Sequence, residues 1–252
     1  MLTAPQLDVL TVPVIKRAAV AGLGINGFSD RAAQFVLERL GLLSECQNVD
    51  CIECEAQIRC SSWIDSQVTK FLTIHPEAQG IELDSGLSTR FHRISDLMDW
   101  PRFSWQCINK PEVNDCLNFV FSQMENYRSI AAESPQLSWS KYLGWKGASE
   151  TIIVIGEDCP LSLERDFDHL HENIKSVRAI KLTKFQLIIR HRIPRLYERL
   201  KSEFPDVVCA GVFIGNSGKR SYQRMLRRLM GFSTSDPIEE LVCLSFDNEL
   251  IS

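Results

Sequence analysis

The chain has 252 residues, of which 44% are hydrophobic and 24% charged, and its formal net charge at pH 7 is -4. This balance is typical of an ordinary globular α/β protein. No apolar run approaches the roughly 18 residues that a membrane-spanning helix needs. The N-terminal stretch M-L-T-A-P-Q-L-D lacks the basic and apolar regions of a secretory signal. We therefore expect a cytoplasmic protein that does not insert into membranes.

The charge is unevenly distributed along the chain. Residues 175–228 contain 14 Lys and Arg against 3 Asp and Glu, whereas the rest contains 14 against 29. A segment this basic could face an anionic partner such as RNA. The alternative is a pair of amphipathic helices whose basic faces are solvated.

The first part of the chain predicts helices. Apolar residues recur at helical spacing over residues 12–43, where Asp30 is a candidate N-cap and Gly41 a candidate stop. A further helix is expected over residues 64–72. We expect residues 1–75 to form a helical cap or lid.

Strands and helices alternate over the remainder, residues 76–252, which we expect to be the main domain. The expected strands are 80–83, 103–108, 129–132, 151–155, 185–189, 207–214 and 241–246. The expected helices are 89–99, 111–124, 161–174, 194–204 and 221–230.

This alternation predicts an α/β fold, a Rossmann-like, mostly parallel seven-stranded sheet with helices on both faces. The last two strands could form an antiparallel pair at one edge, as in class I S-adenosylmethionine (SAM) methyltransferases. Ligands of open sheets bind beyond the carboxyl ends of the strands. Residues 84–86, Asn109 and residues 156–157 are expected to lie there.

Three stretches carry a resemblance to a known family: R-C-S-S-W-I-D-S-Q-V-T-K-F-L, then G-I-E-L-D-S-G-L-S-T-R-F-H-R-I, then W-Q-C-I-N-K-P-E-V. In order and spacing they resemble the leucine carboxyl methyltransferase family, which includes O-methyltransferases of natural-product pathways. The matching residues are Gly86-Leu87, Thr89-Arg90 and Pro111-Glu112-Val113, and the resemblance covers about residues 59–175.

The resemblance implies SAM as cofactor and assigns roles to individual residues. The turn of Asp84, Ser85 and Gly86 would pack against the methionine portion of SAM. The resemblance further implies that Asn109 faces the ribose, Glu133 lies near the adenine, Arg59 pairs with the SAM carboxylate, and Glu157 and Asp158 lie beside the substrate.

Two of these positions depart from the family pattern. Asp84 stands where the family has a glycine, and Asn109 stands where it has an acidic residue that accepts bonds from both ribose hydroxyls. The departures leave two hypotheses: an active O-methyltransferase, or a degenerate relative that serves as an interaction module.

If the protein is active, methyl transfer mainly needs proximity and orientation. A hydroxyl acceptor also needs a base, whereas a carboxylate acceptor does not. Glu157, Asp158 and His92 are the candidate catalytic residues. The acceptor would belong to a small molecule or a carrier-bound intermediate.

Two further interpretations remain open. Cys46, Cys51, Cys54 and Cys60 are close enough in sequence to form a zinc site, although free cysteines in a helix–loop segment are the preferred interpretation. From Ile155 onward the chain loosely resembles viral cap ribose methyltransferases, but their Lys-Asp-Lys-Glu tetrad is absent. RNA binding through residues 175–228 is therefore a third functional hypothesis.

Overall fold

The computed structural model describes most of the chain. The described residues are 3–24, 27–49, 51–133, 139–155, 167–178, 184–191, 195–214 and 240–247. None of the described helices is both long and apolar enough to cross a membrane.

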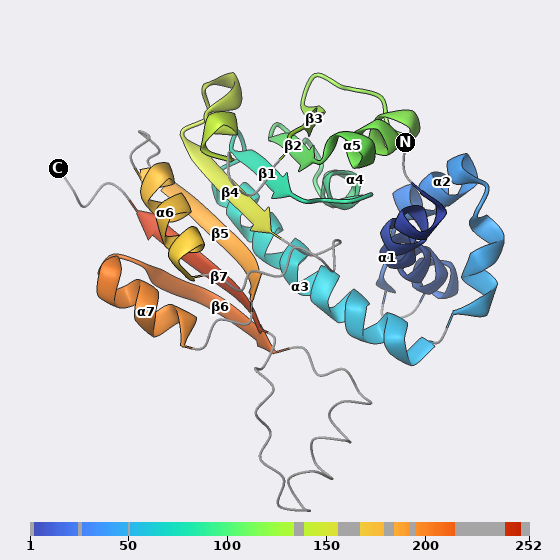
Figure 1. The fold of residues 1–252 in the computed structure, drawn as a ribbon, viewed down its shortest axis with the longest axis horizontal. Coiled ribbons are helices and arrows are strands. Elements are labelled where there is room, and N and C mark those ends of the chain that lie inside the picture. The colour runs from blue at the N-terminus through green and yellow to red at the C-terminus, as the bar shows by residue number, and fades with distance from the viewer. Residues whose placement is uncertain are drawn as a thin grey trace, which may run out of the picture.

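The order of elements follows the expected alternation (Figure 1). The α-helices are α1 (Ala4–Leu23), α2 (Arg31–Leu40), α3 (Cys51–Ile74), α4 (Arg90–Asp96), α5 (Pro111–Val120), α6 (Phe167–Arg178) and α7 (Leu196–Glu203). The strands are β1 (Gln79–Leu83), β2 (Ser104–Asn109), β3 (Tyr127–Ala131), β4 (Glu150–Ile155), β5 (Lys184–His191), β6 (Val208–Ile214) and β7 (Glu240–Asp247). Short 3₁₀ turns are η2 (Leu43–Asn48), η4 (Trp139–Tyr142) and η5 (Trp145–Gly147).

All seven strands form one sheet in the order β3-β2-β1-β4-β5-β7-β6. The strands from β3 to β5 pair in parallel, and β7 runs antiparallel to both of its neighbours. The expected antiparallel pair at one edge is β7 with β6. This arrangement confirms the Rossmann-like class I methyltransferase fold.

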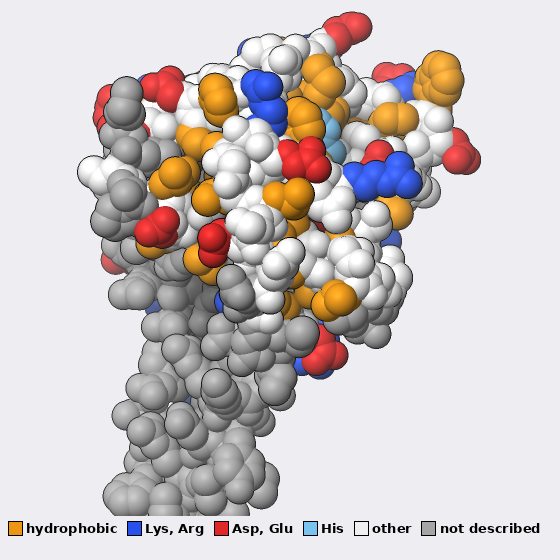
Figure 2. All heavy atoms as spheres, turned by 90° about the vertical axis from the view of Figure 1, so that its right-hand side faces the viewer, with side chains coloured by type: hydrophobic (Ala, Val, Ile, Leu, Met, Phe, Trp, Pro, Cys, Tyr) orange, Lys and Arg blue, Asp and Glu red, His pale blue; other side chains and the backbone are white. Residues whose placement is uncertain are grey.

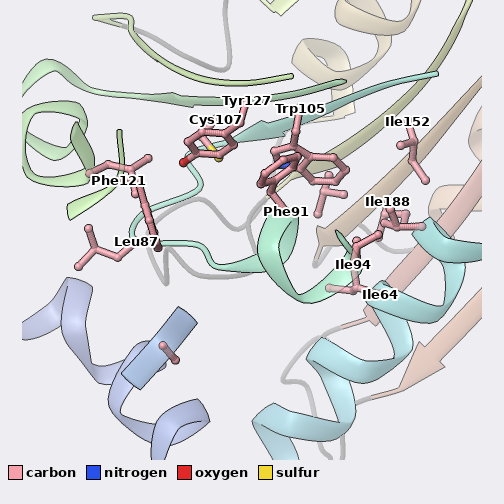
Figure 3. Close-up of a cluster of buried hydrophobic side chains, with 14 of the residues drawn as sticks. Ile64, Leu87, Phe91, Ile94, Trp105, Cys107, Phe121, Tyr127, Ile152 and Ile188 are labelled. Carbon is pink, nitrogen blue, oxygen red and sulfur yellow. The ribbon is translucent and has the colours of Figure 1, made fainter. Parts of the chain in front are cut away.

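Two hydrophobic clusters cover the two faces of the sheet. Helices α1 to α5 contribute to the first cluster, whose residues next to the β1–α4 connection include Leu87, Phe91 and Trp105 (Figure 3). Helices α6 and α7 contribute to the second, through Leu170 and Leu200 among others. The N-terminal helices therefore share a core with the sheet. The division into a cap and a main domain remains a prediction.

The local signals at the helix ends were informative. Asp30 caps α2, because its carboxylate accepts a bond from the Ala33 amide, and Gly41 ends that helix in the left-handed conformation. The pattern over residues 12–43 belongs to two helices rather than one, since α1 ends at Gly24. Helix α3 begins well before residue 64. The predicted helix at 221–230 lies outside the described residues.

Gly80 provides a test of the packing between β1 and β2. It pairs with Trp105 across the two strands, and a Cβ at Gly80 would lie 1.9 Å from Trp105 Cε3. We expect Gly80→Ala to lower the free energy of unfolding by about 3 kcal/mol because the indole has to leave its place. Urea unfolding measures this.

The double variant with Trp105→Val separates the clash from other effects. It should cost less than the sum of the two single variants, because the smaller side chain makes room for the new methyl group. Additive costs would show that the contact between Gly80 and Trp105 does not limit this position.

Candidate active site at the ends of β1 and β2

The connection between β1 and α4 lies at the carboxyl edge of the sheet. The Asp84 amide donates a bond to the Ile108 carbonyl at 2.9 Å, so the first residue after β1 is held to β2. Asp84 has a φ of +49° and Gly86 a φ of +58°. Glycine adopts this conformation freely, whereas a residue with a Cβ pays about 1–2 kcal/mol. The turn therefore contains two left-handed positions, with strain at Asp84.

Asn109 is bonded to this turn from the end of β2. Its Oδ1 accepts a bond from the Gly86 amide at 2.9 Å, and its Nδ2 donates to Ser85 Oγ at 2.8 Å. Both Asn109 and Ser85 are buried. Asn109 thus fastens the turn to the end of β2 through both polar atoms of its amide.

Glu82, within β1, is a functional candidate that sequence reasoning missed. It is buried; its carboxylate forms an ion pair with Arg90 and accepts a bond from Ser88 Oγ at 2.8 Å. A charged side chain inside an apolar strand run is itself a signal, because a buried charge requires a partner. Glu82 therefore links β1 to Ser88, in the turn, and to Arg90, the first residue of α4.

The Glu82–Arg90 pair continues into a larger buried network. Arg90 Nε also donates to Asp65 of α3 at 2.9 Å, and Arg93 Nε donates to the other oxygen of Asp65 at 2.7 Å. Burial alone would raise the pKa of Asp65, but Arg93 and Arg90 together lower it. Asp65 is therefore held as a carboxylate between two guanidinium groups.

The same network reaches the N-terminal helices. Asp30 Oδ2 accepts bonds from Arg93 at 3.0 Å and from Arg17 of α1 at 3.1 Å. Three arginines and three carboxylates are thus buried together, and their formal charges balance. The network connects α1, α2, α3, β1 and α4.

His92 lies on the side of α4 that faces an aromatic cluster. Its ring centroid is 4.4 Å from that of Phe121 and 5.7 Å from that of Tyr127. Its Nε2 is buried and makes no hydrogen bond. Burial lowers the pKa of His92, although Asp30 and Asp96 act in the opposite direction. The ring as a whole is half-buried, and its catalytic role remains a prediction.

The structure brings some of the predicted site residues together and leaves others apart. Ser85, Gly86 and Asn109 meet as expected. Arg59 is exposed on α3, and Glu133 is exposed two residues after β3. Glu157 and Asp158 lie outside the described residues. The roles given to all of these residues remain predictions.

The cysteine segment does not support the predicted metal site. Cys54 packs in a small cluster with Val20 and Ile58, whereas Cys46 and Cys60 pack against the main core. Over the described part of the chain, no three His, Cys, Asp or Glu residues are placed to hold a metal; the Cys51 side chain is not among them. Burial in separate apolar surroundings explains the described cysteines better than zinc does.

Comparison with known proteins finds only distant likenesses, all to solved structures. No protein-family model matches the chain, and no curated protein matches it. The chain is similar in structure to the plantazolicin methyltransferase BpumL in complex with a triazolic desmethylPZN analog and SAH, with 9% identity and a TM-score of 0.45 over 96% of this chain and 99% of that one.

Two other structures illustrate the range of neighbours. A cyclopropane-fatty-acyl-phospholipid synthase-like protein from Lactobacillus casei has 7% identity and a TM-score of 0.46, with 77% of this chain and 92% of that one covered. Aeropyrum pernix fibrillarin in complex with SAM has 13% identity and a TM-score of 0.39, with 67% and 66% covered. The likeness concerns the fold alone, and membership of the leucine carboxyl methyltransferase family remains a prediction.

The enclosed His92 predicts a pH dependence of stability. Because its pKa is lower in the folded protein than in the unfolded chain, the unfolded chain binds the proton first as the pH falls. The wild type should keep its full His92 contribution above a pH of about 6.5 and lose it progressively below. Urea unfolding at pH 7.5 and pH 5 measures the loss.

A His92→Phe variant serves as the control, since its ring does not titrate. It should lose less stability than the wild type between the two pH values. Equal losses in both proteins would mean that the pKa of His92 does not differ between the folded and unfolded states.

Proposed function

We propose that the protein is a SAM-dependent O-methyltransferase that acts on a carboxyl or hydroxyl group of a small molecule or a carrier-bound intermediate. The observation that carries the proposal is the meeting of the β1–α4 turn with the end of β2. This meeting point lies beside the place where the strand order reverses, between β1 and β4. Open sheets of this type bind their ligands there.

The backbone of the turn favours the binding of an adenosyl ligand, whereas the bonds within the turn limit which side chains can hold it. Gly86 has no Cβ and a positive φ, which allows the backbone to approach a ligand closely. Asn109, however, uses both of its polar atoms on the turn. Asn109 pairs with Ala131 across β2 and β3, so Glu133 follows at the same edge of the sheet. Glu133 is the carboxylate that we propose for contact with the adenosine.

The candidate catalytic residues bear on the type of acceptor. SAM supplies a methyl group on a sulfonium, and the protein has to align the acceptor oxygen with it. A hydroxyl acceptor needs a nearby base, and burial lowers the pKa of His92, which favours the neutral imidazole that a base requires. A carboxylate acceptor needs no base. Either acceptor is therefore kept in the proposal, with Glu157 and Asp158 beside it.

A degenerate relative without catalysis is the second candidate. It is favoured by the side chains of Ser85 and Asn109, which are buried and bonded to each other, and by Asp84 in the place of a glycine. In this case the same turn would be a structural element, and the protein would act as an interaction module.

RNA binding has less support among the described residues. Lys175 and Arg178 form ion pairs with Glu172 and Asp206, and Lys201 donates a bond to a backbone carbonyl. Figure 2 shows the side of the N-terminal helices rather than that of α6 and α7, and on this side Lys and Arg side chains are scattered among acidic and apolar ones. Lys175, Arg178 and Lys201 therefore already have partners within the chain.

Isothermal titration with SAM and S-adenosylhomocysteine (SAH) tests the proposal. The wild type should release heat with both ligands. Gly86→Ala should weaken binding at least about tenfold, because a methyl group is added where the backbone approaches the ligand. The absence of heat and of any thermal shift in the wild type would favour the interaction module instead.

Gly24→Ala is the matched control. Gly24 has a φ of +62°, close to that of Gly86, and a Cβ there would have nothing within 4 Å. Both variants therefore impose similar backbone strain, but Gly24→Ala should bind SAM as the wild type does. Equal weakening in both would mean that the loss comes from general destabilisation.

A further inference from the structure

A single carboxylate of the N-terminal helices holds the far end of the β1–α4 turn. Asp30 is 1% exposed and accepts four hydrogen bonds. Oδ1 accepts from the Ala33 amide at 2.9 Å, and Oδ2 accepts from Arg17 Nε at 3.1 Å, Arg93 at 3.0 Å and Thr89 Oγ1 at 2.7 Å. The shortest of the four comes from Thr89, 59 positions later in the chain.

Thr89 lies where the turn becomes α4. It is the N-cap of that helix and is fully buried. Its hydroxyl makes no capping bond to α4; it donates to Asp30 and also accepts a bond from Arg93 at 2.7 Å. A threonine at an N-cap normally accepts a bond from its own helix. Thr89 instead donates to Asp30, the N-cap of α2.

The turn is consequently fastened at two points. At its beginning, Asn109 binds Ser85 and the Gly86 amide. At its end, Thr89 binds Asp30, whose other oxygen caps α2. The N-terminus of α2 and the end of the turn therefore share one carboxylate.

We propose that Asp30 is a positioning residue for the ligand-binding turn, acting through Thr89, so that the N-terminus of α2 and the turn loosen together. The part that concerns ligand affinity rests on the proposed function, whereas the mechanical coupling does not. Asp30 itself does not touch the ligand in this account. Its effect is to keep Gly86 and its neighbours in the conformation that binds.

Amide hydrogen exchange on the unliganded full chain tests the coupling. The reporters are the Gly86 amide, bonded to Asn109, and the Ala33 amide, bonded to Asp30. Thr89→Val removes the hydroxyl but keeps the branched shape. It should speed exchange at both amides by about tenfold, the factor expected for a lost bond to a charged group. Thr89→Ser, which keeps the hydroxyl, should restore wild-type rates.

A control variant separates this effect from general loss of stability. Ile174→Val acts on α6, on the opposite face of the sheet, and should speed all strongly protected amides by a common factor without singling out Gly86 and Ala33. If Thr89→Val does not fold, Thr89→Ala allows the same comparison with a smaller side chain. The proposal would be overturned if Thr89→Val speeds exchange at Gly86 but leaves Ala33 unchanged. It would also be overturned if Thr89→Ser speeds exchange at both amides as much as Thr89→Val does.

Titration with SAH then connects the coupling to binding. Thr89→Val should weaken SAH binding by about three- to tenfold, while Thr89→Ser and Ile174→Val keep wild-type affinity. Unchanged affinity in Thr89→Val would overturn the positioning role. If the wild type binds neither SAM nor SAH while the two amides still respond together, the proposed function fails and the coupling stands.

Discussion

The buried charge network is the interaction on which the rest of the structure depends. Charges removed from water destabilise a fold unless each one is paired. In this protein the partners come from five elements that are distant in sequence, so the network can form only when all five are in place. Its members are Arg17, Asp30, Asp65, Glu82, Arg90 and Arg93. The network therefore fixes where the N-terminal helices sit on the sheet.

The candidate site inherits its shape from this network and from Asn109. The network holds the end of the β1–α4 turn, and Asn109 holds its beginning. The amide of Asn109 thus has a structural role that can be stated without reference to catalysis. Because both of its polar atoms are used on the turn, it leaves fewer groups at this edge for a ribose. The same geometry suits either an O-methyltransferase that binds its cofactor through other groups or a relative that has lost it.

Sequence patterns predicted the elements better than their connections. The mostly parallel sheet followed from alternation, and Asp30 and Gly41 were correctly identified as helix caps because capping chemistry is local. The aromatic surroundings of His92 could not be foreseen, since Phe121 and Tyr127 come from other elements. Glu82 gave a usable signal as a charge inside an apolar strand. The partners of Glu82 could not be predicted, because residues that form ion pairs between distant elements have no characteristic spacing in the sequence.

A double-mutant cycle between Asp65 of α3 and Arg93 of α4 tests the central claim most directly. Asp65→Asn and Arg93→Met should each cost about 3–5 kcal/mol of unfolding free energy at pH 7, because each leaves a buried charge without a full set of partners. The double variant should cost less than the sum by about 2 kcal/mol or more. Costs that add to within about 0.5 kcal/mol would contradict a cooperative network at this place.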